Sequence, residues 1–160
     1  MKYVGLITVR TSSSRLKNKC LLEIGHKLTV IEHIILRCIN ADIEPIICTT
    51  KNKSDQKLVN IAKKFKIKSF RGSEKNKIKR WYDCSTKFKI NNFHTIDADD
   101  LYFDPDAIKK SLDLVRLKTL DIVHPSKHSR YGGASEVYSF TKKGIKKLYL
   151  SLYNYKFNRF

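Results

Sequence analysis

The stretch from residue 10 to residue 19 contains three serines between cations, and these residue types can hold a polyphosphate. It reads Arg10-Thr11-Ser12-Ser13-Ser14-Arg15-Leu16-Lys17-Asn18-Lys19. Hydroxyl and backbone N–H groups donate to phosphate oxygens, while arginine and lysine neutralise phosphate charge. The stretch lacks the G-x-x-x-x-G-K-[ST] pattern of a Walker loop. A polar composition is also typical of an ordinary solvated loop, so composition alone leaves both interpretations open.

A second cluster is acidic and spans residues 97–100, Asp97-Ala98-Asp99-Asp100. Carboxylate oxygens are the hard ligands that Mg²⁺ prefers, often together with phosphate oxygens. Carboxylates directly after a strand also cap helices, so a metal site and a cap are both open here. Asp104 precedes Pro105, and we expect it to cap the following helix.

Apolar runs and helical spacings alternate along the chain. We expect strands at residues 3–9, 45–49, 68–71, 92–96, 120–123 and 136–140. We expect helices at residues 30–40, 54–65, 77–88, 106–117 and 142–152, with N-caps at Thr29, Ser54 and Thr141. This alternation predicts a single α/β domain over residues 1–160, with a mostly parallel, Rossmann-like sheet covered by helices on both faces.

The predicted sheet brings three polar segments to one edge, because ligands of such sheets bind outside the carboxyl ends of the strands. These segments are residues 10–19, residues 71–73 (Arg71-Gly72-Ser73) and residues 97–100. We therefore expect them to form one site.

The chain is strongly basic, with 33 Lys and Arg against 15 Asp and Glu and a net charge of +18. Such a surface attracts nucleic acids, but equally nucleoside triphosphates and acidic sugars. The lysines are spread along the whole chain without an RNP, zinc-finger or basic-zipper pattern, so we do not expect nucleic acid to be the partner. No apolar run approaches the roughly 20 residues of a membrane span. Without a signal-peptide pattern, we expect a cytoplasmic protein with four free cysteines.

Several motifs occur in the order of a known family. Residues 10–19 resemble the A-R-x-G-S-x-R-L-x-x-K signature of the CMP-sugar synthetase superfamily. Residues 21–27 resemble its L-L-P-L-G-G-K-P, residues 31–35 its L-E-H-V-I, and residues 70–74 its F-R-G-S-E. Residues 99–105 resemble G-D-x-P-L-I-D-P, and residues 133–140 resemble G-x-x-x-E-V-F-S-F. The chain is most similar to the spore-coat polysaccharide cytidylyltransferase family, a relative of the acylneuraminate and deoxy-octulosonate cytidylyltransferases.

The resemblance implies transfer of CMP from CTP to a sugar acid or similar anion, with release of pyrophosphate. It implies that Asp99 binds Mg²⁺ and that Lys19, Arg15 and Asp99 are catalytic. It implies that Arg71, Gly72 and Ser73 contact the nucleoside. The residues that would hold the triphosphate are Arg10, Ser13, Ser14, Arg15 and Lys19. Because members of this family often dimerise, the resemblance also leads us to expect a homodimer.

Three departures from the family pattern leave alternatives open. Ser12 replaces a glycine and Lys17-Asn18 replace Pro-Gly, although asparagine tolerates the left-handed region. Relatives continue for dozens of residues, so a truncated enzyme, a naturally short one and a non-catalytic nucleotide-binding domain are all open. Glu136 is open between a site residue and a structural residue. The acceptor is open among keto-deoxy sugar acids, amino sugar acids and phosphonates.

Overall fold

The computed structural model describes residues 2–12, 16–25, 27–117, 120–125 and 138–157. Its strands are β1 (Tyr3–Thr8), β2 (Ile43–Thr50), β3 (Lys68–Gly72), β4 (Asn92–Asp97), β5 (Ile122–Val123) and β6 (Ser139–Thr141). Its helices are α1 (Val30–Asn40), α2 (Gln56–Lys64), α3 (Lys77–Lys87), α4 (Pro105–Leu117) and α5 (Lys142–Phe157). Two short 3₁₀ turns, η1 (Lys19–Leu21) and η2 (Lys53–Asp55), precede α1 and α2.

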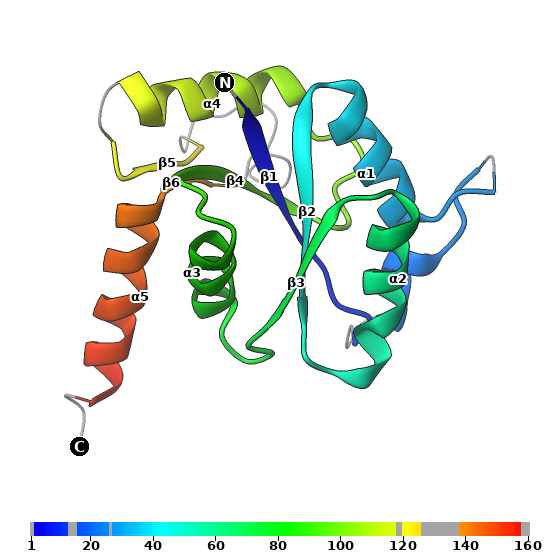
Figure 1. Ribbon diagram of the computed structural model, residues 1–160, viewed down its shortest axis with the longest axis horizontal. Coiled ribbons are helices and arrows are strands. Elements are labelled where there is room, and N and C mark those ends of the chain that lie inside the picture. The colour runs from blue at the N-terminus through cyan, green and yellow to red at the C-terminus, as the bar shows by residue number, and fades with distance from the viewer. Residues whose placement is uncertain (1, 13–15, 26, 118–119, 126–137, 158–160) are drawn as a thin grey trace.

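The strands form one sheet in the order β3-β2-β1-β4-β6-β5 (Figure 1). The pairs β1–β2, β1–β4 and β2–β3 are parallel, while β6 runs antiparallel to both β4 and β5. The predicted α/β class with a mostly parallel sheet is therefore confirmed. Of the strand expected at residues 136–140, residues 136 and 137 lie outside the described residues, and β6 begins at Ser139.

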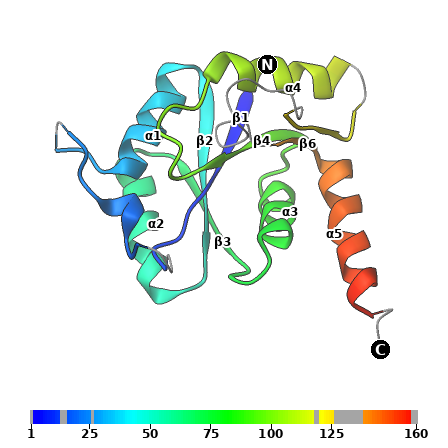
Figure 2. The same ribbon diagram turned by 180° about the vertical axis from the view of Figure 1, so that it is seen from behind.

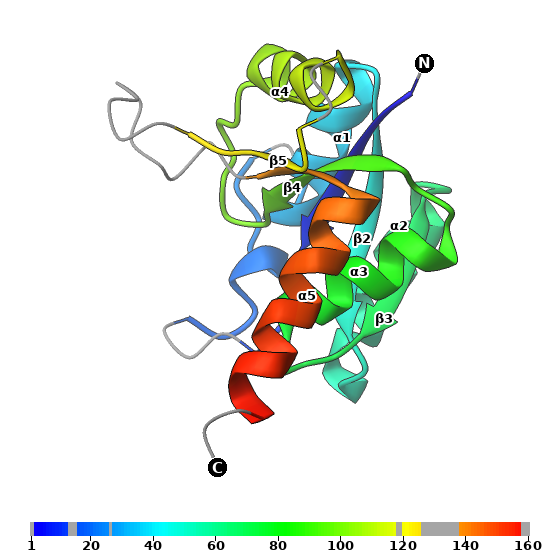
Figure 3. The same ribbon diagram turned by 90° about the vertical axis from the view of Figure 1, so that its left-hand side faces the viewer.

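Helices cover both faces of the sheet, as the alternating pattern predicts. Side chains on one face pack with α1, α2 and α4, and those on the other face pack with α3 and α5. Figures 1 and 3 both show α3 beside α5, and Figure 2 shows α4 across the top of the view from behind. In β1, Leu6 belongs to one apolar cluster and Ile7 to the other, which is the period of two expected of a strand.

The predicted helix caps are confirmed at three helices and wrong at one. The Thr29 backbone N–H donates to the Glu32 carboxylate (2.9 Å), and Gly144 N–H donates to the Thr141 hydroxyl (2.8 Å). Asp104 accepts from Asp106 N–H at 2.9 Å. The helix expected to begin after Ser54 instead begins at Gln56, because residues 53–55 form η2.

Cys20, Cys38, Cys48 and Cys84 are free and buried, so the expectation of unpaired thiols is confirmed in the structure. Within the described residues, no helix has the length and apolar character needed to cross a membrane.

Candidate functional site

A cleft of about 440 Å³ lies at the carboxyl ends of β1 and β4. The residues that line it come from the end of β1 and its loop, from α3 and the segment leading into it, and from the end of β4. They are Thr8, Val9, Arg10, Lys19, Cys20, Glu74, Lys75, Lys77, Arg80, Asp97, Ala98 and Asp99. The two parallel strands lie side by side, with Thr8 opposite Asp97. The sheet therefore brings the first polar loop and the acidic cluster to one cleft.

The loop after β1 is held by a left-handed residue and by backbone bonds. Asn18 has φ 56° and ψ 21°, and its N–H donates to the Thr11 carbonyl at 3.0 Å. Asparagine tolerates this conformation, so the turn closes without the glycine found in the family pattern. Ser13, Ser14 and Arg15 lie outside the described residues, and their phosphate contacts stay predictions.

Asp55, which the sequence analysis did not identify, anchors this loop through its buried carboxylate. Its side chain is buried, and its carboxylate accepts from the Thr11 N–H (2.8 Å) and hydroxyl (2.7 Å). It also accepts from the Thr49 hydroxyl (3.0 Å) and from the Thr50 N–H (3.2 Å) and hydroxyl. Burial raises the pKa of Asp55, but these donors outweigh burial and hold the pKa below its ordinary value. An ionised Asp55 therefore ties the loop after β1 to the end of β2.

Two lysine–carboxylate pairs cross the cleft. The Lys19 ammonium contacts the Asp99 carboxylate, joining residues 80 positions apart in the sequence. The Lys77 ammonium contacts the Asp97 carboxylate at 2.9 Å. Both pairs are partly exposed, so each contributes little to stability. Both pairs lie beside the carboxyl ends of β1 and β4, the edge at which ligands of such sheets bind.

The donor set of the cleft fits Mg²⁺ bound together with a nucleotide. Asp97 and Asp99 both line the cleft, and Mg²⁺ in such sites takes one or two carboxylates plus phosphates and waters. The neighbouring Asp100 has Oδ2 buried without a hydrogen-bond partner among the described residues. Burial raises its pKa, the Tyr102 N–H lowers it, and the nearby Asp99 and Asp97 raise it further. Within the described chain, no group of three or more His, Cys, Asp or Glu residues could hold an ion alone.

The structure does not bring the predicted nucleoside-binding triplet to the cleft. Arg71, Gly72 and Ser73, all within the described part of the chain, are absent from its lining. Arg71 donates to the Thr50 carbonyl (3.1 Å), to Gln56 Oε1 (2.9 Å) and to the carbonyls of residues 51 and 52 (2.9 and 2.8 Å). Its guanidinium thus braces the turn between β2 and α2. Contact of this triplet with a nucleoside stays a prediction.

Gly72 and Ser73 instead position an arginine that sequence reasoning missed. A Cβ built on Gly72 would lie 2.9 Å from Arg80 Cγ, and the Ser73 carbonyl accepts from Arg80 Nη1 at 2.6 Å. Arg80 lines the cleft and is buried. Its four-residue spacing to the buried Cys84 was the available signal, because a cation on an inward helical face needs a partner.

Trp81 is buried against Phe140 and donates to the Thr8 hydroxyl at 2.8 Å, so it is a core residue. Glu136 and the adjacent segment lie outside the described residues.

Comparisons with known proteins agree with this architecture. The family model described as cytidylyltransferase matches residues 4–114, more than half of the chain. An uncharacterised protein of Methanocaldococcus jannaschii is 32% identical over 144 residues, which cover 88% of this chain and 58% of the relative. The chain thus spans less than two thirds of that relative's length.

Solved structures show the same fold. A cytidylyltransferase of Leptospira borgpetersenii superposes with a TM-score of 0.78 at 22% identity, covering 92% of this chain and 64% of the other. A CMP:2-keto-3-deoxy-manno-octonic acid synthetase in complex with CTP gives 0.70 at 16% identity, covering 94% and 78%. Biosynthesis protein A for molybdopterin-guanine dinucleotide, from Archaeoglobus fulgidus, gives 0.70 at 8% identity, covering 96% and 74%. With the match over residues 4–114, these likenesses place the chain in the nucleotidyltransferase fold, and it belongs to the cytidylyltransferase family.

Proposed function

We propose that this chain transfers CMP from CTP to an anionic acceptor such as a sugar acid or phosphonate and releases pyrophosphate. One observation carries the proposal. The Lys19 ammonium and the Asp99 carboxylate, from the loop after β1 and the end of β4, meet in one cleft at the carboxyl ends of parallel strands. A cation for phosphate oxygens and a hard ligand for a divalent ion are the two groups that nucleotidyl transfer needs.

The reaction makes a bond between an acceptor oxygen and the α-phosphorus, and it breaks the bond from that phosphorus to the bridging oxygen. Where the acceptor oxygen belongs to a hydroxyl group, its proton goes to solvent. Pyrophosphate leaves with the electron pair of the broken bond. Charge grows on the phosphate oxygens during this step, so catalysis depends on positioning and on fixed positive charge. Lys19 and Arg10, both on the cleft lining, would supply that charge. Ser13, Ser14 and Arg15 would donate to the same phosphates.

Asp99 would hold the Mg²⁺ ion, with Asp97 close enough to assist. When bound, Mg²⁺ neutralises phosphate charge and aligns the triphosphate. Lys19 now pairs with Asp99, so that pair would open to free the lysine for phosphate and the carboxylate for the ion.

A titration separates this proposal from two other functions. Calorimetry with each of the four nucleoside triphosphates in Mg²⁺ is expected to give a clear preference for CTP. CTP binding without pyrophosphate release, across a panel of sugar acids, would favour a non-catalytic nucleotide-binding domain. Binding of RNA or DNA with steep salt dependence and no CTP preference would favour a nucleic-acid binder.

Two substitutions test the residues. We expect Lys19→Ala and Asp99→Ala each to lower turnover at least about 100-fold, the scale for losing one preorganised charged group. Lys68→Ala is the matched control, because Lys68 forms a 2.8 Å pair with Glu44 at the amino ends of the strands. Turnover in the Lys19 or Asp99 variant equal to that of the control would remove that residue from the mechanism.

Finer assignments also belong to this proposal. The F-R-G-S-E motif at residues 70–74 supports the spore-coat polysaccharide branch of the family and a role in polysaccharide biosynthesis. A homodimer in the cytoplasm is part of the same proposal, and light scattering on the purified protein measures the oligomeric state.

A further inference from the structure

We propose that Arg80 and Lys77 form a second oxyanion subsite, separate from the loop after β1, on the side of the cleft that α3 provides. The ligand group is a phosphate or a carboxylate, either of which presents paired oxygens to a guanidinium. We call these two residues the α3 subsite. The inference rests on the proposed nucleotidyl transfer for the identity of the ligands, but not for the existence of the subsite.

The burial of Arg80 is the first observation. Arg80 is only 3% exposed, yet it lines the cleft. Its stem passes over Gly72, where a Cβ would approach Arg80 Cγ to 2.9 Å. The absence of a side chain at Gly72 therefore lets the arginine lie in this position.

The missing counter-ion is the second observation. Arg80 Nη1 donates to the Ser73 carbonyl at 2.6 Å, while Nε is buried without a hydrogen-bond partner in the described structure. Among the described residues, Arg80 forms no ion pair with a carboxylate, although eight lysine or arginine pairs occur elsewhere. A buried charge without a partner is strongly unfavourable. An oxyanion in the cleft would supply the missing negative charge beside the guanidinium.

Lys77 places a second cation beside Arg80. The two residues are three positions apart on α3 and so lie on one helical face. Two neighbouring cations repel each other, and an anion between them relieves the repulsion. The Lys77 ammonium lies 5.0 Å from the centre of the Trp81 ring and 2.9 Å from the Asp97 carboxylate. Because Trp81 is buried, its ring gives the Lys77 ammonium a fixed surface to rest against at the cleft.

The reaction supplies two anionic groups, which gives the second subsite a purpose. The triphosphate carries one, and the acceptor carries a carboxylate or phosphonate of its own. The loop after β1 and the α3 subsite belong to different elements that line the same cleft. If each group of cations holds one anion, the two negatively charged reactants are kept at a fixed separation despite their repulsion.

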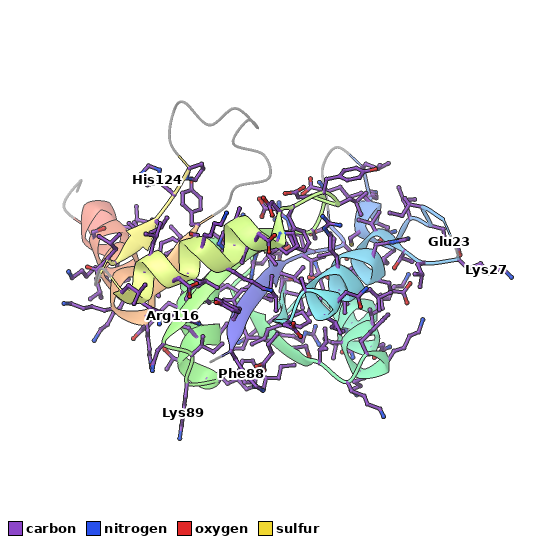
Figure 4. The ribbon with its side chains drawn as sticks, turned by 90° about the horizontal axis from the view of Figure 1, so that it is seen from above. Glu23, Lys27, Phe88, Lys89, Arg116 and His124 are labelled. Carbon is purple, nitrogen blue, oxygen red and sulfur yellow. The ribbon has the colours of Figure 1, made fainter. Side chains whose placement is uncertain are left out.

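Arg80→Met and Arg80→Lys test the subsite by calorimetry on the whole chain. The probes are pyrophosphate, CTP with Mg²⁺, and 2-keto-3-deoxy-manno-octonic acid in the presence of CTP and Ca²⁺ in place of Mg²⁺. Arg116→Met is the matched control. Arg116 is a largely buried arginine near the amino end of β1, beside Lys2, and Figure 4 shows it on the same side of the molecule as Phe88 and Lys89. Melting temperatures of all variants verify folding.

We expect Arg80→Met to weaken at least one oxyanion probe about 10- to 100-fold, the scale of a lost charge-assisted hydrogen bond. Weaker pyrophosphate and CTP binding would identify the ligand group as phosphate. Weaker binding of the sugar acid alone would identify it as carboxylate. Arg80→Lys, which keeps the charge, is expected to fall between wild type and Arg80→Met, and Arg116→Met is expected to match wild type.

Two results would overturn the subsite. One is binding of every probe by both folded Arg80 variants within about twofold of wild type, which is below the expected loss. The other is the same loss in Arg116→Met as in Arg80→Met. The proposed function fails separately, through the absence of a CTP preference in the wild-type protein, and pyrophosphate binding still reports on Arg80 in that case.

Discussion

Replacing Asp55 with asparagine tests whether its buried carboxylate holds the loop after β1 in place. Asp55 is fully buried and accepts five hydrogen bonds, two from Thr11, one from Thr49 and two from Thr50. Asparagine keeps the shape but exchanges one acceptor oxygen for an NH₂ donor. Because Thr11 N–H donates to one oxygen and Thr50 N–H to the other, either orientation of the amide sets NH₂ against a backbone N–H.

The magnitude follows from this geometry. One buried N–H left without an acceptor costs about 1–3 kcal/mol. The remaining hydrogen bonds lose their charge assistance, which adds roughly 1 kcal/mol. We therefore expect Asp55→Asn to lower the free energy of unfolding by about 3 kcal/mol, a large share of the roughly 5–15 kcal/mol of a typical domain.

Urea unfolding at pH 7 measures this loss, with Asp83→Asn as the control. Asp83 pairs with Lys79 at 2.6 Å on the surface of α3, and loss of such a pair costs at most about 0.5 kcal/mol. A destabilisation by Asp55→Asn below about 1 kcal/mol would refute the idea that the carboxylate holds the loop, since one unsatisfied N–H costs at least that much.

The pH dependence gives an independent check. The folded pKa of Asp55 lies below its ordinary value, because the donor hydrogen bonds outweigh the effect of burial. Its ionised form therefore stabilises the fold fully above the unfolded pKa of about 3.9. That stabilisation is lost as the pH falls through the folded pKa. The difference in stability between wild type and Asp55→Asn should thus be constant near neutral pH and shrink below about pH 4.

Two further predictions concern packing and thiols. Gly72→Ala should destabilise the chain by about 1–3 kcal/mol in the same urea assay, the usual cost of overpacking, since a Cβ would lie 2.6 Å from Phe70 Cε1 and 2.9 Å from Arg80 Cγ. A stability equal to wild type would mean that Arg80 can leave its place over Gly72 freely. The cysteines should react with a thiol reagent only after unfolding, because all four are buried and burial raises the pKa of Cys20 to about 11 and of Cys38 to about 12. Rapid labelling of any thiol in the native protein would contradict this.

Most of the fold could be predicted because its signals are local. Period-two apolar runs and helical spacings gave the strands and helices with ends shifted by a few residues, as at β2, which begins at Ile43 rather than at Pro45. The rule that ligands bind at the carboxyl ends of parallel strands then brought residues 10–19 and 97–100 together. The Lys19–Asp99 contact across 80 positions follows from that rule and from the β1–β4 pairing.

The features that sequence reasoning did not find depend on long-range partners. Ser54 has the sequence features of an N-cap, but the backbone of η2 instead turns inward so that Asp55 can meet Thr11 and Thr49. Arg71 stands in a motif that predicts nucleoside contact, yet four acceptors from the β2–α2 turn and α2 surround its guanidinium. The pairing of β3 with β2 brings Arg71 close to these acceptors, and no local sequence pattern predicts that pairing.

Two lysines in the cleft pair with the carboxylates that we propose as ligands of the ion. Lys19 neutralises Asp99 and Lys77 neutralises Asp97. On the proposed function, Mg²⁺ alone would have to displace a lysine from a carboxylate and leave that lysine without a partner. A triphosphate alone would take a lysine and leave the carboxylate beside phosphate charge. With both ligands present, each lysine would pair with a phosphate oxygen while Asp97 and Asp99 would hold the ion. On the proposed function, the pairing would therefore favour joint binding of metal and nucleotide, and by linkage each ligand would strengthen binding of the other by the same factor.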